Sequence, residues 1–142
     1  MNVKIKNKSI RLKKVTKSDS PFLYDLLRER DPRAFISHRK MPTYEEHLKF
    51  VMSKPYSIWY IILFNNQKIG SISLTRQDEI GLWITKTMCG KGIGTKVLQL
   101  FIKKNPRPRY FANISPRNLG SIEFFKKNGF QLFQYTYELI NS

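Results

Sequence analysis

The sequence is poor in cysteine, in acidic residues and in long apolar runs, and each shortage excludes a class of protein. A single cysteine, Cys89, cannot form an internal disulfide, which favours a protein of the reducing cytoplasm. The longest apolar run, residues 58–64, is far shorter than the roughly 18 residues that span a bilayer. Residues 1–8 lack the apolar core of a signal peptide. We therefore expect a cytoplasmic protein with no membrane span.

The shortage of acidic residues leaves a large positive charge. Only 10 Asp and Glu residues oppose 26 Lys and Arg residues, so the net charge is +16. This excess favours anionic partners, which include phosphates, nucleic acid, an acidic protein and a membrane surface. A solvated surface that binds nothing explains most of the lysines equally well. The charge alone does not choose among these interpretations.

Length and composition indicate one folded domain. The chain has 142 residues and is 41% hydrophobic, which is enough for a sizeable core. It contains no repeat, low-complexity tract or linker, so we expect a single domain over residues 1–142. Glycine is scarce, yet three of the 7 glycines fall within residues 90–94. That concentration directs attention to one loop.

The spacing of apolar residues predicts an α/β protein in the order β-α-α-β-β-β-α-β-α-β. The expected strands are 9–15, 56–64, 68–76, 79–85, 109–114 and 130–140. The expected helices begin near Ser18, at Thr43, at about Gly92 and at Asn118, and the last one ends at Gly129. Thr43 and Glu46 form a capping box, and the apolar stripe of that helix is expected to be Tyr44, Leu48, Val51 and Met52.

Residues 89–94 are the most informative segment. They lie between an apolar strand and a segment with helical periodicity, and helix N-termini bind phosphate through their free N–H groups. The loop is not a P-loop, because Thr85 stands where the first glycine belongs. It is not a dinucleotide fingerprint either, because Thr95 stands at the third glycine. Kinase and hydride-transfer functions are therefore disfavoured, and another phosphorylated cofactor is expected.

Two motifs resemble those of the GNAT family of acetyl-CoA-dependent N-acetyltransferases. The family carries Q/R-x-x-G-x-G/A before its central helix, and Cys89-x-x-Gly92-x-Gly94 matches except at the first position. It also carries N-x-x-[SA]-x-x-[FY]-[YF]-x-x-x-G-F near its C-terminus, which residues 118–130 match. The resemblance implies an α/β GNAT fold. In that fold a mixed, mostly antiparallel sheet is splayed in the middle and flanked by about four helices.

The resemblance also implies acetyl-CoA as the cofactor, bound between the strands expected at 79–85 and 109–114. Its pyrophosphate would lie on the N–H groups of residues 90–95, with Lys91 and Lys96 adding charge. Its pantetheine arm would pair with the backbone of residues 82–84. Asn118 would contact the arm, cap a helix, or do both. The expected cofactor-binding residues are Leu82, Trp83, Ile84, Cys89, Gly90, Lys91, Gly92, Ile93, Gly94, Thr95, Asn118, Ser121 and Phe125.

The acceptor amine must be neutral to attack, which calls for a general base. Glu79 is the first candidate, because relatives often keep a catalytic glutamate early in the corresponding strand; its alternative role is a solvated strand-end carboxylate. His47 is the second candidate and could instead be a surface or packing residue. His38 is a candidate lining residue of the acceptor pocket.

The general acid departs from the family pattern. Relatives often place a tyrosine where this chain has Phe125, which has no proton to donate. Tyr110, Tyr135, Tyr137 or water could replace it. Cys89 as a nucleophile is disfavoured, because no base is placed beside it.

The acceptor is predicted from a basic segment, residues 28–47, which is expected to form its pocket. The segment is rich in cations, namely Arg28, Arg30, Arg33, Arg39 and Lys40. It favours a small anionic amine such as an amino-sugar nucleotide, and residues 42–47 look like those of some amino-sugar members. A protein N-terminus on a ribosome is the competing acceptor. A non-catalytic acyl-CoA sensor or nucleic-acid-binding module is a further alternative, supported by Phe125 and Cys89. We expect no metal site, and the oligomeric state stays open.

Overall fold

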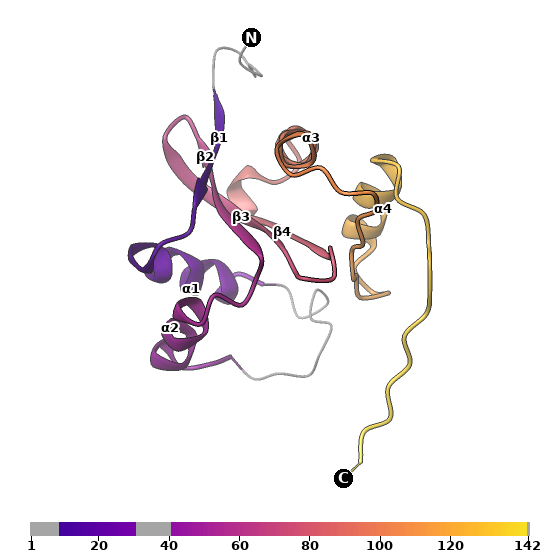
Figure 1. Ribbon diagram of the computed structural model, residues 1–142, viewed down its shortest axis with the longest axis horizontal. Coiled ribbons are helices and arrows are strands. Elements are labelled where there is room, and N and C mark those ends of the chain that lie inside the picture. The colour runs from indigo at the N-terminus through magenta and orange to yellow at the C-terminus, as the bar shows by residue number, and fades with distance from the viewer. Residues whose placement is uncertain (1–8, 31–40, 142) are drawn as a thin grey trace.

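A four-stranded antiparallel sheet in the order β1-β2-β3-β4 forms the centre of the protein (Figure 1). The computed structural model describes residues 9–30 and 41–141. The strands are β1 (Ile10–Lys14), β2 (Ile58–Phe64), β3 (Gln67–Leu74) and β4 (Ile80–Ile84). The helices are α1 (Ser20–Arg28), α2 (Tyr44–Met52), α3 (Ile93–Lys104) and α4 (Leu119–Lys127). Short 3-10 turns, η1 (Lys17–Asp19) and η3 (Lys86–Met88), precede α1 and α3.

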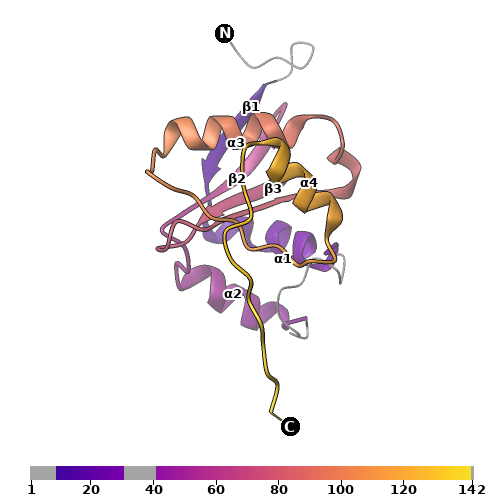
Figure 2. The ribbon, with the colours of Figure 1, turned by 90° about the vertical axis from the view of Figure 1, so that its right-hand side faces the viewer.

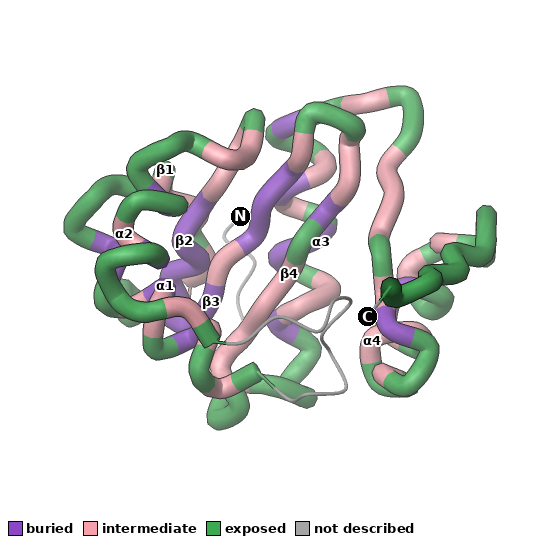
Figure 3. The backbone as a smooth tube through the Cα atoms, turned by 90° about the horizontal axis from the view of Figure 1, so that it is seen from below, coloured by how far each residue is buried: buried purple, intermediate pink, exposed green. Residues whose placement is uncertain are grey.

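Helices cover both faces of the sheet, with α3 on one side and α1 and α2 on the other (Figure 2). Successive side chains of β2 alternate between these two layers. Ile61 packs with Leu23 of α1 and Val51 of α2, whereas Ile62 packs in the cluster that includes Phe101 of α3. Because both faces are covered, β2 is apolar along its whole length, and Figure 3 shows burial concentrated in the sheet and its inner helix faces.

The second helix begins where the sequence predicts but buries a different face. Glu46 N donates to Thr43 Oγ1 at 3.1 Å, and Thr43 N donates to Glu46 Oε1 at 2.8 Å, so the capping box is confirmed. The buried residues of α2 are His47 and Val51, whereas Tyr44 and Met52 are exposed, so the expected stripe is wrong at both ends. Because His47 is polar, a search for apolar residues alone does not identify this buried face of α2.

The last two expected strands are not formed among the described residues. In 109–114 only Phe111 pairs, through one parallel bridge to Glu79, because the chain then diverges from β4. Residues 130–141 contain no regular secondary structure, although the strand 130–140 was expected. Gly129, with φ of +93°, ends α4 as predicted. The chain then runs away from the body of the protein, where no described strand lies beside it (Figures 1 and 2).

The remaining elements agree with the sequence-based order to within a few residues. The result is an α/β protein whose described part has a four-stranded sheet and four α-helices. No helix in the described ranges combines the length and the hydropathy needed to cross a membrane.

Candidate active site

The site begins where β4 and the segment 109–113 meet at a single point. Ile80 N donates to Phe111 O at 2.7 Å, and Phe111 N donates to Asp78 O at 2.9 Å. No other backbone hydrogen bond joins these two segments among the described residues. On its other edge β4 pairs with β3 over its full length. Among the described residues, the outer edge of β4 therefore has no strand partner beyond this junction.

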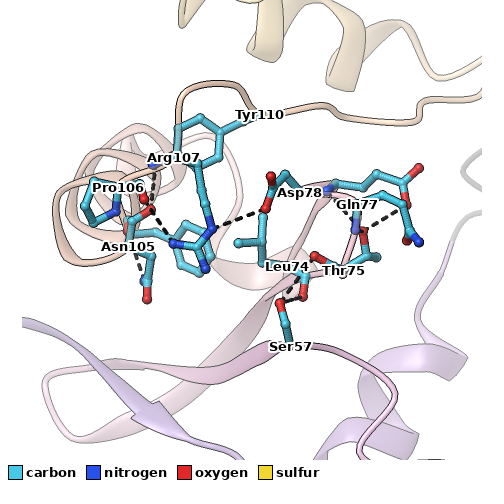
Figure 4. A network of polar contacts seen from close by, with 11 residues as sticks. Ser57, Leu74, Thr75, Gln77, Asp78, Asn105, Pro106, Arg107 and Tyr110 are labelled. Carbon is cyan, nitrogen blue, oxygen red and sulfur yellow. Dashed lines mark hydrogen bonds and ion pairs between the residues drawn. The ribbon is translucent and has the colours of Figure 1, made fainter.

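A polar network holds the junction in place (Figure 4). Arg107 Nε donates to Asp78 Oδ1 at 3.2 Å, which ties the loop after α3 to the turn between β3 and β4. The Tyr110 hydroxyl donates to Asn105 O at 2.6 Å and accepts from Arg107 N at 2.9 Å. Tyr110, a candidate general acid, therefore holds a loop, and its proton is engaged with a backbone carbonyl.

Glu79 lies at this junction with its carboxylate held from two sides. Thr75 Oγ1 donates to Glu79 Oε1 at 2.9 Å, and Asn113 Nδ2 donates to Glu79 Oε2 at 2.7 Å. Sequence reasoning identified Glu79 but missed both partners. The Thr75-x-x-x-Glu79 spacing across a tight turn was a usable local signal, whereas nothing in the sequence paired Glu79 with Asn113, 34 residues away.

The face of β4 that carries Glu79 also carries an aromatic ring and a cation. The even-numbered side chains of β4 pack with the cluster that includes α3, so Glu79, Gly81 and Trp83 face the side of α1 and α2. The Arg30 guanidinium lies 5.0 Å from the centroid of the Trp83 indole. Partial desolvation lowers the pKa of Arg30, but an arginine still stays protonated at physiological pH. One face thus combines a carboxylate, a glycine without a side chain, an indole and a cation.

The outer edge of β4 offers backbone groups from alternate residues. Thr75 N donates to Glu79 O and Thr85 N donates to Ile69 O, so the odd-numbered residues pair with β3. The hydrogen-bonding direction alternates along a strand, so Leu82 and Ile84 point outward, as Ile80 does. Trp83 presents its backbone to β3, and of the three residues expected to bind a pantetheine arm it is the one that points elsewhere.

Residues 89–94 form an open turn at the N-terminus of α3. Gly90 and Gly92 both have φ of +76°, a conformation that L-residues rarely adopt. A Cβ built on either glycine would meet no atom within 4 Å, so the space in front of the backbone is clear. Gly94 has a different role, because its Cβ would lie 3.0 Å from Phe124 Cε1 of α4. Clear space, positive φ and the free N–H groups of a 12-residue helix fit a phosphate.

The side chains of this loop vary in what they can offer a ligand. Lys91 is exposed, whereas Ile93 is buried in the core, so only its backbone can reach a ligand. Thr95 Oγ1 accepts from Asn128 Nδ2 at 3.3 Å, an interaction that sequence reasoning missed. The Cys89 thiol donates to Ile84 O at 3.4 Å. Desolvation and the nearby Glu29 carboxylate raise the pKa of Cys89, which disfavours a thiolate nucleophile.

Two of the expected cofactor residues at α4, Asn118 and Phe125, also have structural roles. Asn118 Oδ1 accepts from Ser121 N at 3.2 Å, so the predicted N-cap is confirmed. Phe125 is buried, with its ring centroid 5.1 Å from that of Phe124 and 5.0 Å from that of Phe130. The side chain of Phe125 therefore packs against Phe124 and against Phe130 beyond the end of α4, and Phe124 is the one that reaches α3.

His47 lies apart from this group. It is buried among aromatic rings, 5.4 Å from Tyr24 and 6.4 Å from Phe50 between centroids. Burial lowers the pKa of His47, and its Nε2 has no hydrogen-bond partner among the described residues. No described contact joins it to Glu79, β4 or the glycine loop. His38, Arg33, Arg39 and Lys40, expected at the acceptor pocket, lie outside the described residues.

Comparison with known proteins agrees with this geometry. The model of the acetyltransferase (GNAT) domain matches residues 9–131. A domain from Methanocaldococcus jannaschii superposes with a TM-score of 0.77 and 25% identity, covering 93% of this chain and 94% of the other. An acetyltransferase from Thermus thermophilus gives 0.72 and 20%, covering 92% and 90%. RimL, an α-N-acetyltransferase of ribosomal protein L7/L12 solved with coenzyme A, gives 0.71 and 18%, covering 94% and 86%. No curated protein sequence matches significantly.

Proposed function

This chain belongs to the GNAT acetyltransferase family, and on that premise we propose that it acetylates the primary amine of a small anionic acceptor, such as an amino-sugar nucleotide. As a GNAT N-acetyltransferase it uses acetyl-CoA, which supplies the acetyl group as a thioester. The observation that carries the proposal is Arg30, whose guanidinium lies over the Trp83 indole, on the face of β4 that holds Glu79. A cation on the same face as the proposed base favours an acceptor that brings its own negative charge.

The cofactor is proposed to bind along the free edge of β4. The N–H groups of residues 90–95 hold the pyrophosphate, where the open space at Gly90 and Gly92 admits it. The outward backbone groups of Leu82 and Ile84 pair with the pantetheine arm. An outward N–H of this edge also stabilises the oxyanion that develops on the carbonyl under attack.

Glu79 is proposed as the general base that removes a proton from the acceptor ammonium. Thr75 and Asn113 hold one carboxylate oxygen each, which fixes the direction in which the remaining lone pairs point. A positioned base contributes roughly 10²–10⁴ in rate. His47 remains an alternative base, but its burial among the rings of α1 and α2 supports a packing role.

Departure of the CoA thiolate is proposed to need no protein acid. Phe125 carries no proton, Tyr110 donates to Asn105 O, and Tyr135 and Tyr137 lie exposed on the segment that leaves the body. A thiol has a pKa of about 8.5, so its thiolate is a tolerable leaving group at neutral pH. Water can protonate it after release.

A protein N-terminus is the second candidate acceptor. RimL, one of the structural neighbours, acts on the N-terminus of ribosomal protein L7/L12. The same Arg30 cation would then receive an acidic side chain of the peptide. A non-catalytic acyl-CoA sensor is less well supported, because such a module would gain nothing from a carboxylate held by two donors.

The experiment measures acetylation of three primary amines: an amino-sugar nucleotide, an acidic N-terminal peptide and a neutral amino sugar. We expect the nucleotide to have the highest kcat/KM. Arg30→Gln should raise its KM roughly 10-fold or more, the value of one lost charge-assisted contact, and leave the neutral amine unchanged. Arg28→Gln is the matched control, because Arg28 is exposed and pairs with Asp25.

Glu79→Gln should lower kcat for every acceptor and leave acetyl-CoA affinity unchanged. A higher kcat/KM for the acidic peptide than for the nucleotide would indicate that a protein N-terminus is the acceptor. Equal loss of activity toward charged and neutral amines in Arg30→Gln would contradict an anionic acceptor.

A further inference from the structure

The sheet face opposite α3 is open at β4. The core on this face joins Leu23 of α1 and Val51 of α2 to Ile61 and Leu63 of β2, and among the described residues no side chain of β3 or β4 belongs to it. Gly81, in the middle of β4, is exposed on the same face. The described parts of α1 and α2 therefore cover β2 and leave β4 accessible beside Glu79.

Small residues and two indoles form this open part of the sheet. Ser73 of β3 is paired with Trp59 of β2 on one side and with Gly81 of β4 on the other, and the next residue on the same face of β3, Ser71, is paired with Trp83. Paired residues direct their side chains to the same face. We call these residues the β3–β4 floor: Trp59, Ser71, Ser73, Gly81 and Trp83.

The hydroxyl of Ser73 points into the space above Gly81. Ser73 is only 7% exposed, and its Oγ makes no hydrogen bond among the described residues. Unlike Ser20 Oγ, it is not sealed from solvent. A Cβ built on Gly81 would lie 2.9 Å from Ser73 Oγ, and apart from its chain neighbours it would meet no other atom within 4 Å. Because a hydroxyl this deep in a protein is normally hydrogen-bonded, the clear space in front of it suits a ligand that supplies the partner.

The floor lies within one ring of the proposed base. Glu79 precedes Gly81 by two residues on the same face, so roughly 7 Å of strand separates them. An acceptor whose amine meets Glu79 therefore places the atoms next to its amine over Gly81. A sugar ring suits this position, because its hydroxyls bond to polar groups while its C–H faces pack against aromatic rings such as those of Trp59 and Trp83.

We propose that Ser73 is a specificity-determining residue of the acceptor site, and that its hydroxyl bonds to a ring hydroxyl of an amino-sugar acceptor in the space left by Gly81. The inference rests on the proposed function, because it places the acceptor on the face that holds Glu79. A side chain at position 81 would meet the Ser73 hydroxyl before the ring could. A site built to bond a substrate hydroxyl disfavours analogues without that hydroxyl, because its own polar group is then left unpaired.

Acetylation of glucosamine and of cyclohexylamine tests the proposal. Cyclohexylamine is a ring amine without hydroxyls, and neither compound has an anionic group for Arg30 to bind. Ser73→Ala should lower kcat/KM for glucosamine roughly 5- to 10-fold, mainly by raising KM, which is the effect of one neutral hydrogen bond. Its kcat/KM for cyclohexylamine should not change. Ser71→Ala is the matched control, because Ser71 lies on the same strand and face but opposite Trp83 instead of a glycine.

Gly81→Ala tests the opening independently. Its methyl group would meet only the Ser73 hydroxyl, which can rotate away, so we expect the variant to fold. Its loss of kcat/KM for glucosamine should be at least as large as that of Ser73→Ala. Because both changes affect one contact, the double variant should lose less than the product of the two single losses. A loss equal to that product would contradict the pairing of hydroxyl and opening; if Gly81→Ala does not fold, Ser73→Ala with its control still decides the question.

Tryptophan fluorescence measures acceptor binding without acetyl transfer. The only two tryptophans of the chain, Trp59 and Trp83, both belong to the floor. Glucosamine should change the emission of the wild type, and Ser73→Ala should bind glucosamine more weakly by the factor found for KM. Binding without turnover would support the Ser73 site and contradict acetyl transfer to this acceptor.

Three results would overturn the role of Ser73. The first is turnover with the same ratio of kcat/KM for glucosamine and cyclohexylamine in the wild type and in Ser73→Ala, which would leave the acetyltransferase activity in place. The second is a loss in Ser73→Ala that is confined to the acidic peptide, which would assign the floor to a peptide. The third is an absence of both binding and turnover with glucosamine.

Discussion

Asn113 Nδ2 donates to Glu79 Oε2 across 2.7 Å, and this bond joins the two segments whose divergence opens the site. Glu79 precedes β4, and Asn113 follows Phe111 on the opposite segment. The bond therefore does two things: it orients the proposed base, and it links the two segments just beyond their single bridge.

Asn113→Ala should lower kcat roughly 10- to 100-fold, because a base free to rotate spends less time in the productive direction. The KM for acetyl-CoA should not change, since Asn113 lies away from the glycine loop. Steady-state kinetics with both substrates varied measures the split. Gln77→Ala is the control, because Gln77 is in the same turn and is hydrogen-bonded there through its backbone N–H, which donates to Thr75 Oγ1. Equal activity of Asn113→Ala and Gln77→Ala would remove Asn113 from the mechanism.

Gly92→Ala should weaken acetyl-CoA binding about 10-fold or more. Its φ of +76° costs an L-residue about 1–2 kcal/mol, and the added methyl enters the space proposed for the pyrophosphate. Isothermal titration measures the dissociation constant. Gly120→Ala is the matched control: Gly120 has an ordinary helical conformation in α4, and its Cβ would meet Asn118 Oδ1 only at 4.0 Å. Gly120→Ala should bind normally and be slightly more stable. Equal affinities in the two variants would place the pyrophosphate elsewhere.

Asn118→Ala should have two separable effects, because the residue caps α4 and is proposed to contact the cofactor arm. Loss of the bond to Ser121 N should lower stability by about 1 kcal/mol. Thr43→Ala removes the equivalent cap of α2, away from the glycine loop and β4, and should cost a similar amount. Urea unfolding measures both, and titration with acetyl-CoA separates them: only Asn118→Ala should bind more weakly. If the two variants bind equally well, Asn118 is a helix cap alone.

Asp19 should make stability depend on pH in the acid range. Burial opposes its ionisation, but hydrogen bonds from Lys13, Lys68 and Thr16 N outweigh burial and lower its pKa from 3.8 to about 2. A depressed folded-state pKa stabilises the protein above the unfolded value of 3.8, and this contribution is lost as the pH falls towards 2.

The contribution of Asp19 is roughly 2 kcal/mol at neutral pH. Urea unfolding of the wild type and Asp19→Asn should therefore differ most near pH 6, and the difference should shrink below pH 4 and be smallest below about pH 2. Asp25→Asn is the control, because Asp25 is exposed and pairs only with Arg28 of the same helix turn. A gap between wild type and Asp19→Asn that stays constant with pH would mean that the carboxylate charge is not the source of the stability.

Several features of the site could be predicted from short stretches of sequence. The glycine loop, the Thr43 capping box and the Asn118 cap each depend on residues within a few positions of one another. Their geometry is therefore determined by short stretches of sequence. Glu79 could also be identified from the sequence, because its position early in the strand before the glycine loop is a local feature.

Other features required the folded chain. The sequence around Glu79 does not predict its contact with Asn113, and the sequence around Trp83 does not predict its contact with Arg30. Both pairs meet only when separate elements pack together. For His47 the sequence suggested a role that the fold does not favour. Its position near a capped helix start made it a candidate base, but α2 directs its side chain into an aromatic cluster.

The amino-acid sequence by itself determined the family, the order of most elements, the helix caps and the glycine loop before α3, because each depends on local backbone preference and on the period of apolar residues. Only the tertiary structure decided that 109–114 pairs at one residue, that Asn113 holds Glu79, and that residues 130–141 form no regular strand. The physical reason is that alternation of side chains identifies a strand, but a strand forms only where another backbone lies alongside to accept its hydrogen bonds.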